Sequence, residues 1–338
     1  MTTHRFCTYC DKGYAARLLC LHESLVHQGE PFVLYVLCFD RETEAVVRAW
    51  AMPSLVAVAL DEVLRADPAY AAVQAQRSPV EFFFTATPVI IRHCLERDEA
   101  AERVTYLDAD LFFFGPASAV FAEQGEASVG IVPHRFPSHL KAREQYGLYN
   151  VAWVSFRRDA NGLACLEWWR KRCLEWCHDR WEYGRFADQG YLDEFPRRFA
   201  GVKVLHHPGI DAAPWNIGEA KTTQRGNHVL VDGQPLLFYH YQGIRELSPG
   251  WFEPGLRQYQ VSLTKPVREL VYLPYLRKLV QMQQRLRQRH GIEAQFTYQR
   301  LNAGRSLRDR WERFKARWVL PYYGRVLGRL VYGGGASG

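Results

Sequence analysis

The chain has 338 residues, of which 48% are hydrophobic and 23% charged, so it can bury a large core as one big α/β domain or as one domain with an appendage. It contains no run of about 18 apolar residues, which excludes a hydropathy-defined membrane-spanning helix, and its N-terminus lacks a secretory signal pattern. The net charge of +7 is uneven, because residues 256–338 hold 17 Lys and Arg against 4 Asp and Glu, whereas residues 1–255 hold 26 against 32. These features predict a cytoplasmic protein in two parts, 1–255 and 256–338.

Along residues 1–255, segments with the periodicity of strands alternate with segments with the periodicity of helices. Strands are predicted at residues 4–10, 32–40, 55–60, 104–108, 127–133, 149–156, 202–208 and 235–243, and helices at 14–26, 79–96 and 162–180. Pro88 marks a kink or a helix start. The tryptophans at helix-like spacing are interpreted as core or interface anchors: Trp168, Trp169, Trp176 and Trp181. The alternation predicts a mostly parallel central sheet with helices on both faces.

Beyond residue 255 the pattern becomes helical and basic, in residues 270–290 and 307–332, and the glycine-rich end at 333–338 is expected to be disordered. Leucine, valine and aromatic residues mixed with Arg and Lys are typical of a helix that lies in a membrane interface and contacts anionic lipid. They are equally typical of an accessory helical bundle with a solvated basic face. The sequence leaves both interpretations open.

The eight cysteines are interpreted as reduced structural thiols. Most lie in apolar settings, where free cysteine behaves as a small hydrophobic residue. Cys7 and Cys10 form one close pair and Cys173 and Cys177 another, but a zinc site would need two such pairs at tight spacing.

Two carboxylates stand one residue apart between two apolar segments, in the stretch YLDADLFFF at residues 106–114. Asp108 and Asp110 come where a buried strand should end, and ligands of open α/β sheets bind beyond the carboxyl ends of the strands. Residues i and i+2 share one side of a strand, so both carboxylates can reach one point. A divalent cation would relieve their mutual repulsion. The pair therefore predicts a hard cation such as Mg²⁺ that holds a diphosphate.

Two histidines are candidates for a further ligand of that cation. His240 comes late in a predicted strand, two residues before Gln-Gly, where a lone histidine is more often structural. Beside a carboxylate pair it becomes the preferred imidazole ligand. His134, next to Arg135, is the second candidate.

Arg77, Asp188 and Gln189 are candidates for contacts with a donor or an acceptor. Arg77 lies four residues before Glu81, so a plain helix ion pair is the alternative. Asp188 and Gln189 begin a predicted helix, and Asp188 could instead be an N-cap. We interpret the pair as site residues because they follow the later strands of the sheet.

Five segments in order resemble glycosyltransferase family 8, the glycogenin and lipopolysaccharide galactosyltransferase type of GT-A-fold enzyme. CTYCDKGYAARLLCLHESL resembles the family's opening strand and helix, and YLDADLFFF resembles its D-x-D segment. YNVAWVSFRRD resembles its asparagine strand, FADQGYLDEF its Asp-Gln helix start, and YHYQG its late His-x-x-Gly. Each motif alone is weak, and the five together are fairly specific. The resemblance spans residues 4 to about 250 and implies a GT-A fold, a nucleotide-sugar donor and a divalent metal.

The resemblance also implies a role for each matching residue. Tyr9, Asp11 and Tyr14 would line the base pocket, and Asp108, Asp110 and His240 would bind Mn²⁺ or Mg²⁺. Gly243 would contact the phosphate. Asn150, Asp188 and Gln189 would face the sugar and the acceptor. Glutamine at the Asp-Gln position favours transfer with retention of configuration.

Three positions depart from the family's pattern. Val151 stands where the family has a glycine after its asparagine. The family's basic residue three positions after the late glycine is missing, and Arg245, two positions after it, is expected to substitute. The early arginine of the family's middle helix has no direct match, and Arg77 or Arg92 is expected to take its place.

Together these observations predict a metal-dependent glycosyltransferase of the hexosyltransferase type. It would transfer a sugar from a UDP-sugar to a glycan or glycolipid acceptor of the cell envelope, with possible peripheral contact to an anionic membrane. One alternative is a sugar nucleotidyltransferase or metal-dependent phosphodiesterase, although the first should show a glycine-rich loop after the first strand and TYCDKGYAARL has one glycine. Another is a non-catalytic membrane or nucleic-acid binder driven by the basic extension. The acidic first 255 residues disfavour it, and no nucleic-acid partner is predicted.

Overall fold

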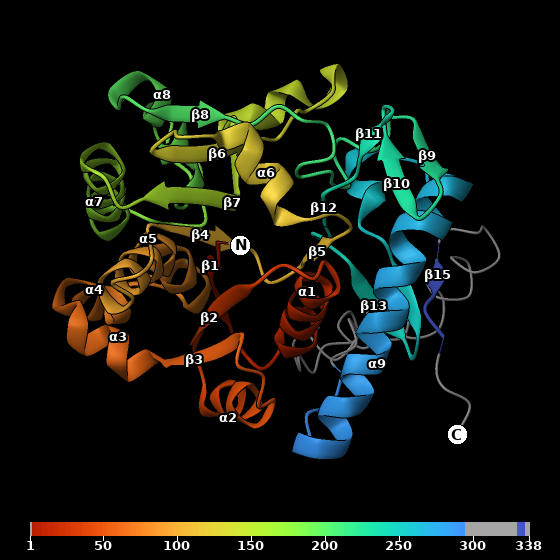
Figure 1. Cartoon of the computed structure of the whole chain (residues 1–338), viewed down its shortest axis with the longest axis horizontal. Coiled ribbons are helices and arrows are strands. Elements are labelled where there is room, and N and C mark those ends of the chain that lie inside the picture. Colours follow the sequence, from red (N-terminus) through yellow and green to blue (C-terminus); the bar gives the residue numbers. More distant parts are fainter. Residues whose placement is uncertain (1, 295–329, 335–338) are drawn as a thin grey trace, which may run out of the picture.

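A seven-stranded sheet forms the centre of the protein, whose computed structural model describes residues 2–294 and 330–334 (Figure 1). In spatial order its strands are β3 (Leu55–Ala59), β2 (Phe32–Cys38), β1 (His4–Cys10), β4 (Arg103–Leu107), β7 (Tyr149–Arg157), β6 (Val129–Pro133) and β8 (Val202–Val204). Strand β7 runs antiparallel to β4 and β6, and the other neighbouring strands are parallel. The predicted mixed α/β architecture with a mostly parallel sheet is confirmed.

Helices cover both faces of this sheet, because successive side chains of a strand point to opposite faces. In β1, Phe6 and Cys10 enter one buried cluster and Cys7 enters the other. The first cluster is covered by α1 (Ala15–His27), α2 (Arg41–Ala49), α6 (Ala117–Gln124) and α9 (Leu273–His290), and the second by α3 (Leu60–Ala66), α4 (Pro68–Val73), α5 (Pro79–Arg97), α7 (Ala160–Glu175) and α8 (Phe195–Arg198) (Figure 1). Burial of both faces explains why several strands are continuously apolar.

Among the described residues there are three smaller sheets. They are β5 (Leu111–Phe113) with β12 (Phe238–His240); β9 (Thr222–Arg225) with β10 (His228–Val231) and β11 (Gln234–Pro235); and β13 (Arg245–Ser248) with β14 (Trp251–Glu253) and β15 (Val331–Tyr332). The sheets of β5 and of β15 join segments that are distant in sequence. The antiparallel pairing of β5 with β12 places His240 opposite Leu111, the residue after Asp110. This pairing brings the predicted imidazole ligand to the carboxylate pair.

Two helix ends show how local chemistry sets the boundaries. Helix α5 begins at a capping box, in which Glu81 N donates to the Ser78 side chain and Ser78 N donates to Glu81, so Pro88 lies inside the helix rather than at its start. Helix α7 ends at Glu175, five residues before the predicted end. Side chains satisfy carbonyls of its last turn, because Arg77 donates to Leu174 O and Tyr191 donates to Trp176 O.

All eight cysteines lie in the described part of the chain, and each is buried and unpaired. Burial raises the pKa of the Cys20 and Cys165 thiols, which keeps them protonated near neutral pH. The interpretation as structural thiols agrees with this placement.

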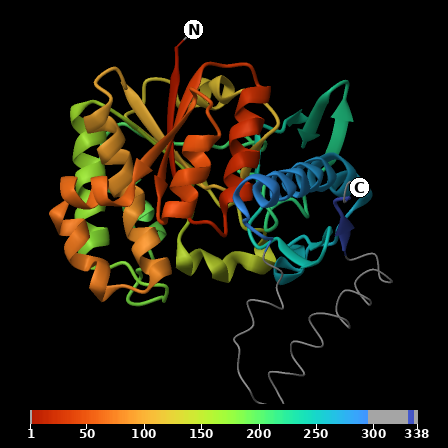
Figure 2. The same ribbon diagram turned by 90° about the horizontal axis from the view of Figure 1, so that it is seen from below.

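The described part of the C-terminal extension packs on the rest of the chain. After a 3-10 helix (Leu256–Tyr259) and a π-helical turn (Val267–Tyr272), α9 packs against α1 (Figure 2). Its apolar face is buried in the same cluster as α1, through Tyr275, Leu276, Leu279, Val280, Met282 and Leu286. Its basic residues Lys278 and Arg285 form ion pairs with Glu23 of α1. For α9, amphipathicity therefore reflects intramolecular packing.

Most of the second predicted basic helix, residues 307–329, and most of the predicted disordered tail, residues 335–338, lie outside the described residues. At the end of that predicted helix, residues 331–332 form strand β15, which pairs with β14. The helical prediction is wrong there, because a neighbouring strand edge offers the two residues backbone partners.

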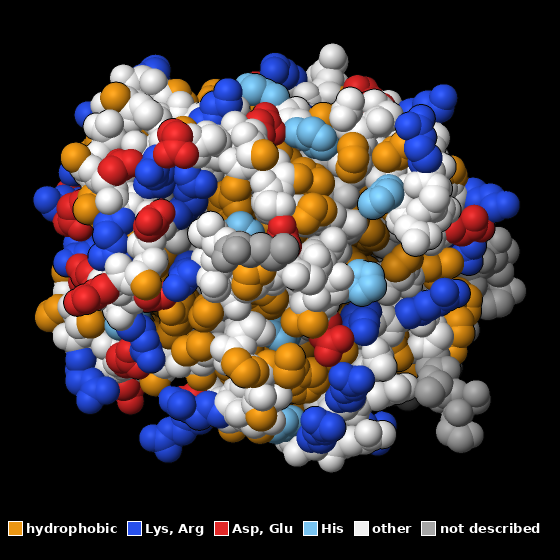
Figure 3. Space-filling view, in the orientation of Figure 1, with side chains coloured by type: hydrophobic (Ala, Val, Ile, Leu, Met, Phe, Trp, Pro, Cys, Tyr) orange, Lys and Arg blue, Asp and Glu red, His pale blue; other side chains and the backbone are white. Residues whose placement is uncertain are grey.

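None of the described helices has the length and apolarity needed to span a bilayer. Acidic and basic side chains are interspersed over α3, α4 and α7 on the face shown in Figure 3. On that face the charges do not form the continuous basic stripe typical of a nucleic-acid binder.

Candidate functional site

The carboxylate pair sits at the carboxyl end of β4, where the sheet stops and the chain turns into β5. Asp108 N donates to Ala152 O of β7 at 3.1 Å, and Leu111 N donates to Asp108 O at 3.1 Å, so the turn is held at both ends. The Tyr106 hydroxyl donates to Asp108 Oδ1 at 2.9 Å. Asp110 is buried and Asp108 is half-buried. The strand-end position predicted from sequence is the observed one.

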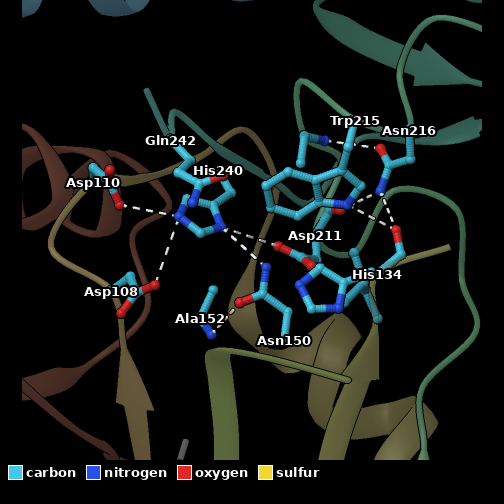
Figure 4. Close-up of polar contacts among 12 residues, drawn as sticks. Asp108, Asp110, His134, Asn150, Ala152, Asp211, Trp215, Asn216, His240 and Gln242 are labelled. Atoms are coloured by element: carbon cyan, nitrogen blue, oxygen red, sulfur yellow. Dashed lines mark hydrogen bonds and ion pairs between the residues drawn. The ribbon is translucent and has the colours of Figure 1, made fainter. Parts of the chain in front are cut away.

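His240 completes a group of three possible metal ligands. Its Nε2 lies 3.2 Å from Asp110 Oδ1 and 3.6 Å from Asp108 Oδ2 (Figure 4). One ligand atom from each residue lies within 4.8 Å of the other two. Two carboxylate oxygens and one imidazole nitrogen converging on one point suit a divalent cation such as Mn²⁺ or Mg²⁺. The residues present therefore fit the metal that the sequence predicted.

The electrostatics of this group show why a cation would be stabilised there. Burial raises the pKa of the Asp108 carboxyl to about 6, and the Asp110 charge adds to the effect although His240 opposes it. Burial acts to lower the pKa of His240, but Asp110, Asp211 and Asp108 outweigh it and raise that pKa well above its usual value. The imidazolium is thus the positive charge that balances the carboxylates here.

Behind His240 lies a second layer of polar side chains. Asn150 Nδ2 is 3.3 Å from His240 Nδ1, and Asn150 Oδ1 accepts from Ala152 N at 2.9 Å. Asp211 Oδ1 is 3.6 Å from the same Nδ1 (Figure 4). Asn150 was predicted to face the sugar, whereas its buried amide contacts His240. Sequence reasoning missed Asp211, which lies within the loop after β8 rather than directly at a strand end and belongs to no quoted motif.

Arg17 was also missed. From inside α1, its Nη1 lies 3.5 Å from Asp110 Oδ2 and its Nη2 donates to Ile244 O at 2.9 Å. Its guanidinium lies 4.7 Å from the centre of the Tyr14 ring. It is therefore the described arginine whose guanidinium reaches the carboxylate pair, and spacing along a helix gave no signal of this long-range contact.

A cleft of about 990 Å³ opens over the carboxylate pair and His240. The predicted site residues that line it are Tyr9, Asp11, Tyr14, Asp108, Asp110, Asn150, Asp188, Gln189 and His240. Its other walls are formed by side chains of α5 and of the segments 134–151 and 179–189. The structure thus brings nine of the twelve predicted site residues to one cleft.

The remaining three lie elsewhere. Arg77 Nη2 donates to Leu174 O at 3.2 Å, which directs it to the end of α7. Arg245 is 59% exposed and pairs with Glu253 at 3.0 Å. Gly243 has a φ of +79°, and a Cβ there would lie 2.6 Å from Gln258 Nε2, so its side faces protein. The predicted donor contacts of Arg77 and Arg245 are not supported, because local ion pairs and carbonyls hold both side chains away from the cleft.

The alternative arginine and the alternative histidine can also be placed. Arg92 pairs with Glu96 at 2.8 Å and with Glu167 at 3.6 Å on the surface of α5. His134 lines the cleft and stacks on Phe136 with ring centres 4.7 Å apart, but it is outside the group of three ligands. Burial lowers the pKa of His134 to about 4. His240 is the histidine that geometry associates with the carboxylate pair.

Asp188 and Gln189 sit where the chain enters a short 3-10 helix (Gln189–Glu194). Asp188 occupies the N-cap position of this helix, but its side chain makes no capping hydrogen bond. Its Oδ2 is buried without a hydrogen-bond partner, and burial together with the Asp108 charge raises its pKa to about 7. Gln189 Nε2 donates to Tyr146 O at 3.0 Å, which holds its amide at the cleft wall.

Exposed aromatic side chains mark the mouth of the cleft. Trp181 is 50% exposed and Tyr146 is 37% exposed, and both line the cleft. Tyr146 and Phe186 meet edge to face with ring centres 5.0 Å apart, so residues 138–146 and 179–189 are joined there. The prediction that Trp181 is a core or interface anchor is wrong as to the core, because α7 ends before it and its indole faces solvent.

The fold and the site define an α/β protein with a candidate divalent-cation centre at the floor of a large cleft. No family model matches the chain. It is 33% identical over 258 residues to YfnF of Bacillus subtilis, covering 73% of this chain and 83% of YfnF. It is 28% identical over 287 residues to YfnD of the same organism, covering 82% and 89%. The chain therefore belongs to the family of YfnF, and neither protein's name gives an activity.

Comparison with solved structures returns glycosyltransferases. The galactosyltransferase LgtC, in complex with donor and acceptor sugar analogues, matches 78% of this chain and 99% of its own at 14% identity and a TM-score of 0.47. Mouse xyloside xylosyltransferase 1 matches 72% and 98% at 13% identity and a TM-score of 0.44. At these scores the likeness carries no argument about activity, which has to come from the residues of the cleft.

Proposed function

We propose that this protein is a metal-dependent glycosyltransferase that moves a sugar from a UDP-sugar to a glycan or glycolipid acceptor, with retention of configuration. The observation that carries the proposal is the convergence of Asp108, Asp110 and His240 at the floor of the 990 Å³ cleft. That volume can hold a nucleotide sugar together with part of an acceptor.

The donor's diphosphate leaves with developing negative charge, so positive charge must be aimed at it. A divalent cation held by the two carboxylates and His240 would supply most of that charge. Arg17 is placed to add to it, since its guanidinium lies 3.5 Å from Asp110. Tyr9, Asp11 and Tyr14 at the end of β1 are proposed to contact the base. Tyr14 is 38% exposed and presents a ring for stacking.

In the transfer, the bond between the anomeric carbon and the phosphate oxygen breaks, and the bond to the acceptor oxygen forms. The acceptor hydroxyl gives its proton to the departing phosphate oxygen, so no protein base is needed. We propose that Gln189 stabilises the sugar as positive charge develops, because its amide is neutral and fixed to Tyr146 O. Asp188, which lines the cleft, is proposed to accept hydrogen bonds from the sugar.

A membrane-associated acceptor of the cell envelope remains a proposal supported by charge alone. Residues 256–338 carry 17 Lys and Arg against 4 Asp and Glu. Anionic lipid would attract such a segment by about 1 kcal/mol per basic residue at its surface, less in salt. The apolar face of α9 is buried, so this attraction would be electrostatic for that helix.

A hydrolysis screen tests the proposed function without knowledge of the acceptor. The purified protein is incubated with UDP-sugars and Mn²⁺, and products are separated. Slow release of free sugar and UDP that stops with EDTA supports the proposal. A nucleotidyltransferase would release pyrophosphate from UTP and a sugar phosphate, and a phosphodiesterase would release UMP. Asp108→Asn should stop this release, because one of the three possible metal ligands is lost. Asp61→Asn, which changes an exposed carboxylate of α3, is the matched control.

A further inference from the structure

Asp211 is the least expected charged residue in the protein. It lies in the loop between β8 and β9, its side chain is fully buried, and neither carboxylate oxygen has a hydrogen-bond partner among the described residues. Its backbone φ is +52°, a conformation that L-residues other than Asn and Asp seldom adopt. A buried carboxylate without partners costs several kcal/mol. The nearest basic nitrogen given by the structure is His240 Nδ1, at 3.6 Å.

The loop is held so that Asp211 keeps this place. Arg135 Nη2 donates to Asp211 O at 3.1 Å, and Asn216 Nδ2 donates to the same oxygen at 3.0 Å. His240 N donates to Ala212 O at 2.8 Å, which ties the loop to β12 beside the imidazole. The loop that carries the Asp211 carboxylate is therefore hydrogen-bonded to the strand that carries the His240 ring.

The two nitrogens of His240 face opposite partners. Figure 4 shows the ring between Asp108 and Asp110 on one side and Asp211 on the other. A neutral imidazole that uses Nε2 as a ligand must carry its proton on Nδ1, and that proton needs an acceptor. Asn150 cannot accept it, because its Oδ1 accepts from Ala152 N and its Nδ2, 3.3 Å from Nδ1, can only donate. The Asn150 amide must therefore turn away from Nδ1 when that nitrogen carries the proton. Asp211 is the acceptor left within reach.

We propose that Asp211 is a positioning residue that accepts the Nδ1 proton of His240 and thereby directs the Nε2 lone pair at the point shared by Asp108 and Asp110. This inference rests on the proposed metal site and assigns its outer partner. A carboxylate behind a ligating histidine fixes the ring's tautomer and increases its basicity, and loss of such a partner typically weakens metal affinity about 10- to 100-fold.

The backbone conformation of Asp211 determines which substitutions can test the proposal. Asn and Gly both tolerate a φ of +52°, so Asp211→Asn and Asp211→Gly remove the charge without adding backbone strain. Mn²⁺ affinity is measured by calorimetry with the metal alone. We expect Asp211→Asn to bind Mn²⁺ about 10-fold more weakly and Asp211→Gly up to about 100-fold more weakly. The control Asp98→Asn removes a partly buried carboxylate that accepts from Arg5 and Tyr35 and should bind Mn²⁺ as the unaltered protein does.

A second measurement separates positioning from a merely structural effect. Histidine-selective ¹⁵N NMR with Mg²⁺ reports which nitrogen of His240 carries the proton. We expect the Nδ1–H form in the unaltered protein and a shift towards Nε2–H in Asp211→Gly. Affinity within twofold of the unaltered protein in both variants, or an unchanged tautomer, would overturn the inference. If the unaltered protein itself binds no Mn²⁺, the proposed metal site fails, and the inference with it.

Discussion

Asp188 is a predicted site residue whose ionisation lowers the stability of the folded protein. Its carboxyl is buried with one unpartnered oxygen, and burial followed by the Asp108 charge raises its pKa to about 7. In an unfolded chain the pKa of the same carboxyl is about 4. The folded state therefore holds a proton that the unfolded state releases, and stability falls as pH rises from about 4 to about 7.

Asp188→Asn should consequently stabilise the metal-free protein at pH 8. The full shift corresponds to roughly 4 kcal/mol, an upper limit because the new amide is also buried. Thermal unfolding in EDTA at pH 8 and at pH 4 checks this. The melting temperature of the variant should exceed that of the unaltered protein at pH 8 and converge with it at pH 4, while sugar release is lost. A variant less stable at pH 8 would contradict the assignment.

The two histidines of the cleft give a second test at the residue scale. His240→Ala should weaken Mn²⁺-dependent UDP binding at least tenfold, about 1.4 kcal/mol, because one of three ligands is removed. His134→Ala should change it less than threefold, since His134 stacks on Phe136 and is outside the ligand group. Calorimetry on both variants measures this. The reverse order would assign the ligand role to His134.

Some of these residues could be read from the sequence and others could not. Asp108 and Asp110 follow from a local pattern, an apolar strand that ends in two acids. His240 needed one assumption, that a late strand returns to that end, and the pairing of β5 with β12 fulfils it. Asp211 and Arg17 depend on contacts between segments that are distant in sequence. Periodicity describes the faces of one element and is silent about such approaches.

At the scale of elements, two irregular segments shape the mouth of the cleft. Residues 138–146 form a 3-10 helix. After α7 ends at Glu175, residues 176–188 form bends and turns, with a β-bridge between Glu182 and Arg185. Their aromatic side chains at the cleft are half-exposed, and clustered exposed aromatics mark binding surfaces. An aromatic ring beside polar groups such as Asp179 and Arg180 suits the C–H face and hydroxyls of a sugar.

Trp181→Ala should therefore weaken acceptor binding and spare donor hydrolysis. With an acceptor glycoside, we expect KM for the acceptor to rise about tenfold, or about 1.4 kcal/mol. UDP-sugar hydrolysis without acceptor should stay within twofold. Tyr183→Ala is the matched control, because Tyr183 is two residues away and 87% exposed but does not line the cleft. Equal effects of the two changes on KM would rule out a specific contact by Trp181.

At the scale of the whole molecule, α9 joins the extension to the main sheet. Tyr241 and Tyr275 stack with ring centres 3.7 Å apart, and the Tyr272 hydroxyl donates to Pro254 O at 2.9 Å. The change of charge near residue 255 predicted a junction between two parts of the chain, and that boundary stays a prediction. It gave no information about burial, because the basic residues lie on the outer face of a helix whose inner face is apolar.

Removal of residues 256–338 should consequently unfold the protein. Each fully buried large apolar side chain contributes about 1.5–3 kcal/mol, and six such side chains of α9 together match the 5–15 kcal/mol of a typical fold. Circular dichroism of the fragment 1–255 should show no cooperative melting. A smaller change, Leu276→Ala in the full chain, should lower the free energy of unfolding by about 2–5 kcal/mol. A fragment that melts cooperatively and releases sugar would show that residues 1–255 fold alone.

The central claim is that Asp108 and Asp110 hold a divalent cation that binds the donor's diphosphate. Calorimetric titration of UDP, with and without Mn²⁺, into the unaltered protein, Asp108→Ala, Asp110→Ala and the surface control Asp61→Ala tests it most directly. The account predicts that Mn²⁺ strengthens UDP binding in the unaltered protein and in Asp61→Ala, and that both cleft variants lose this dependence while their circular dichroism spectra stay unchanged. Mn²⁺-dependent UDP affinity that is unchanged in Asp108→Ala and Asp110→Ala would contradict it.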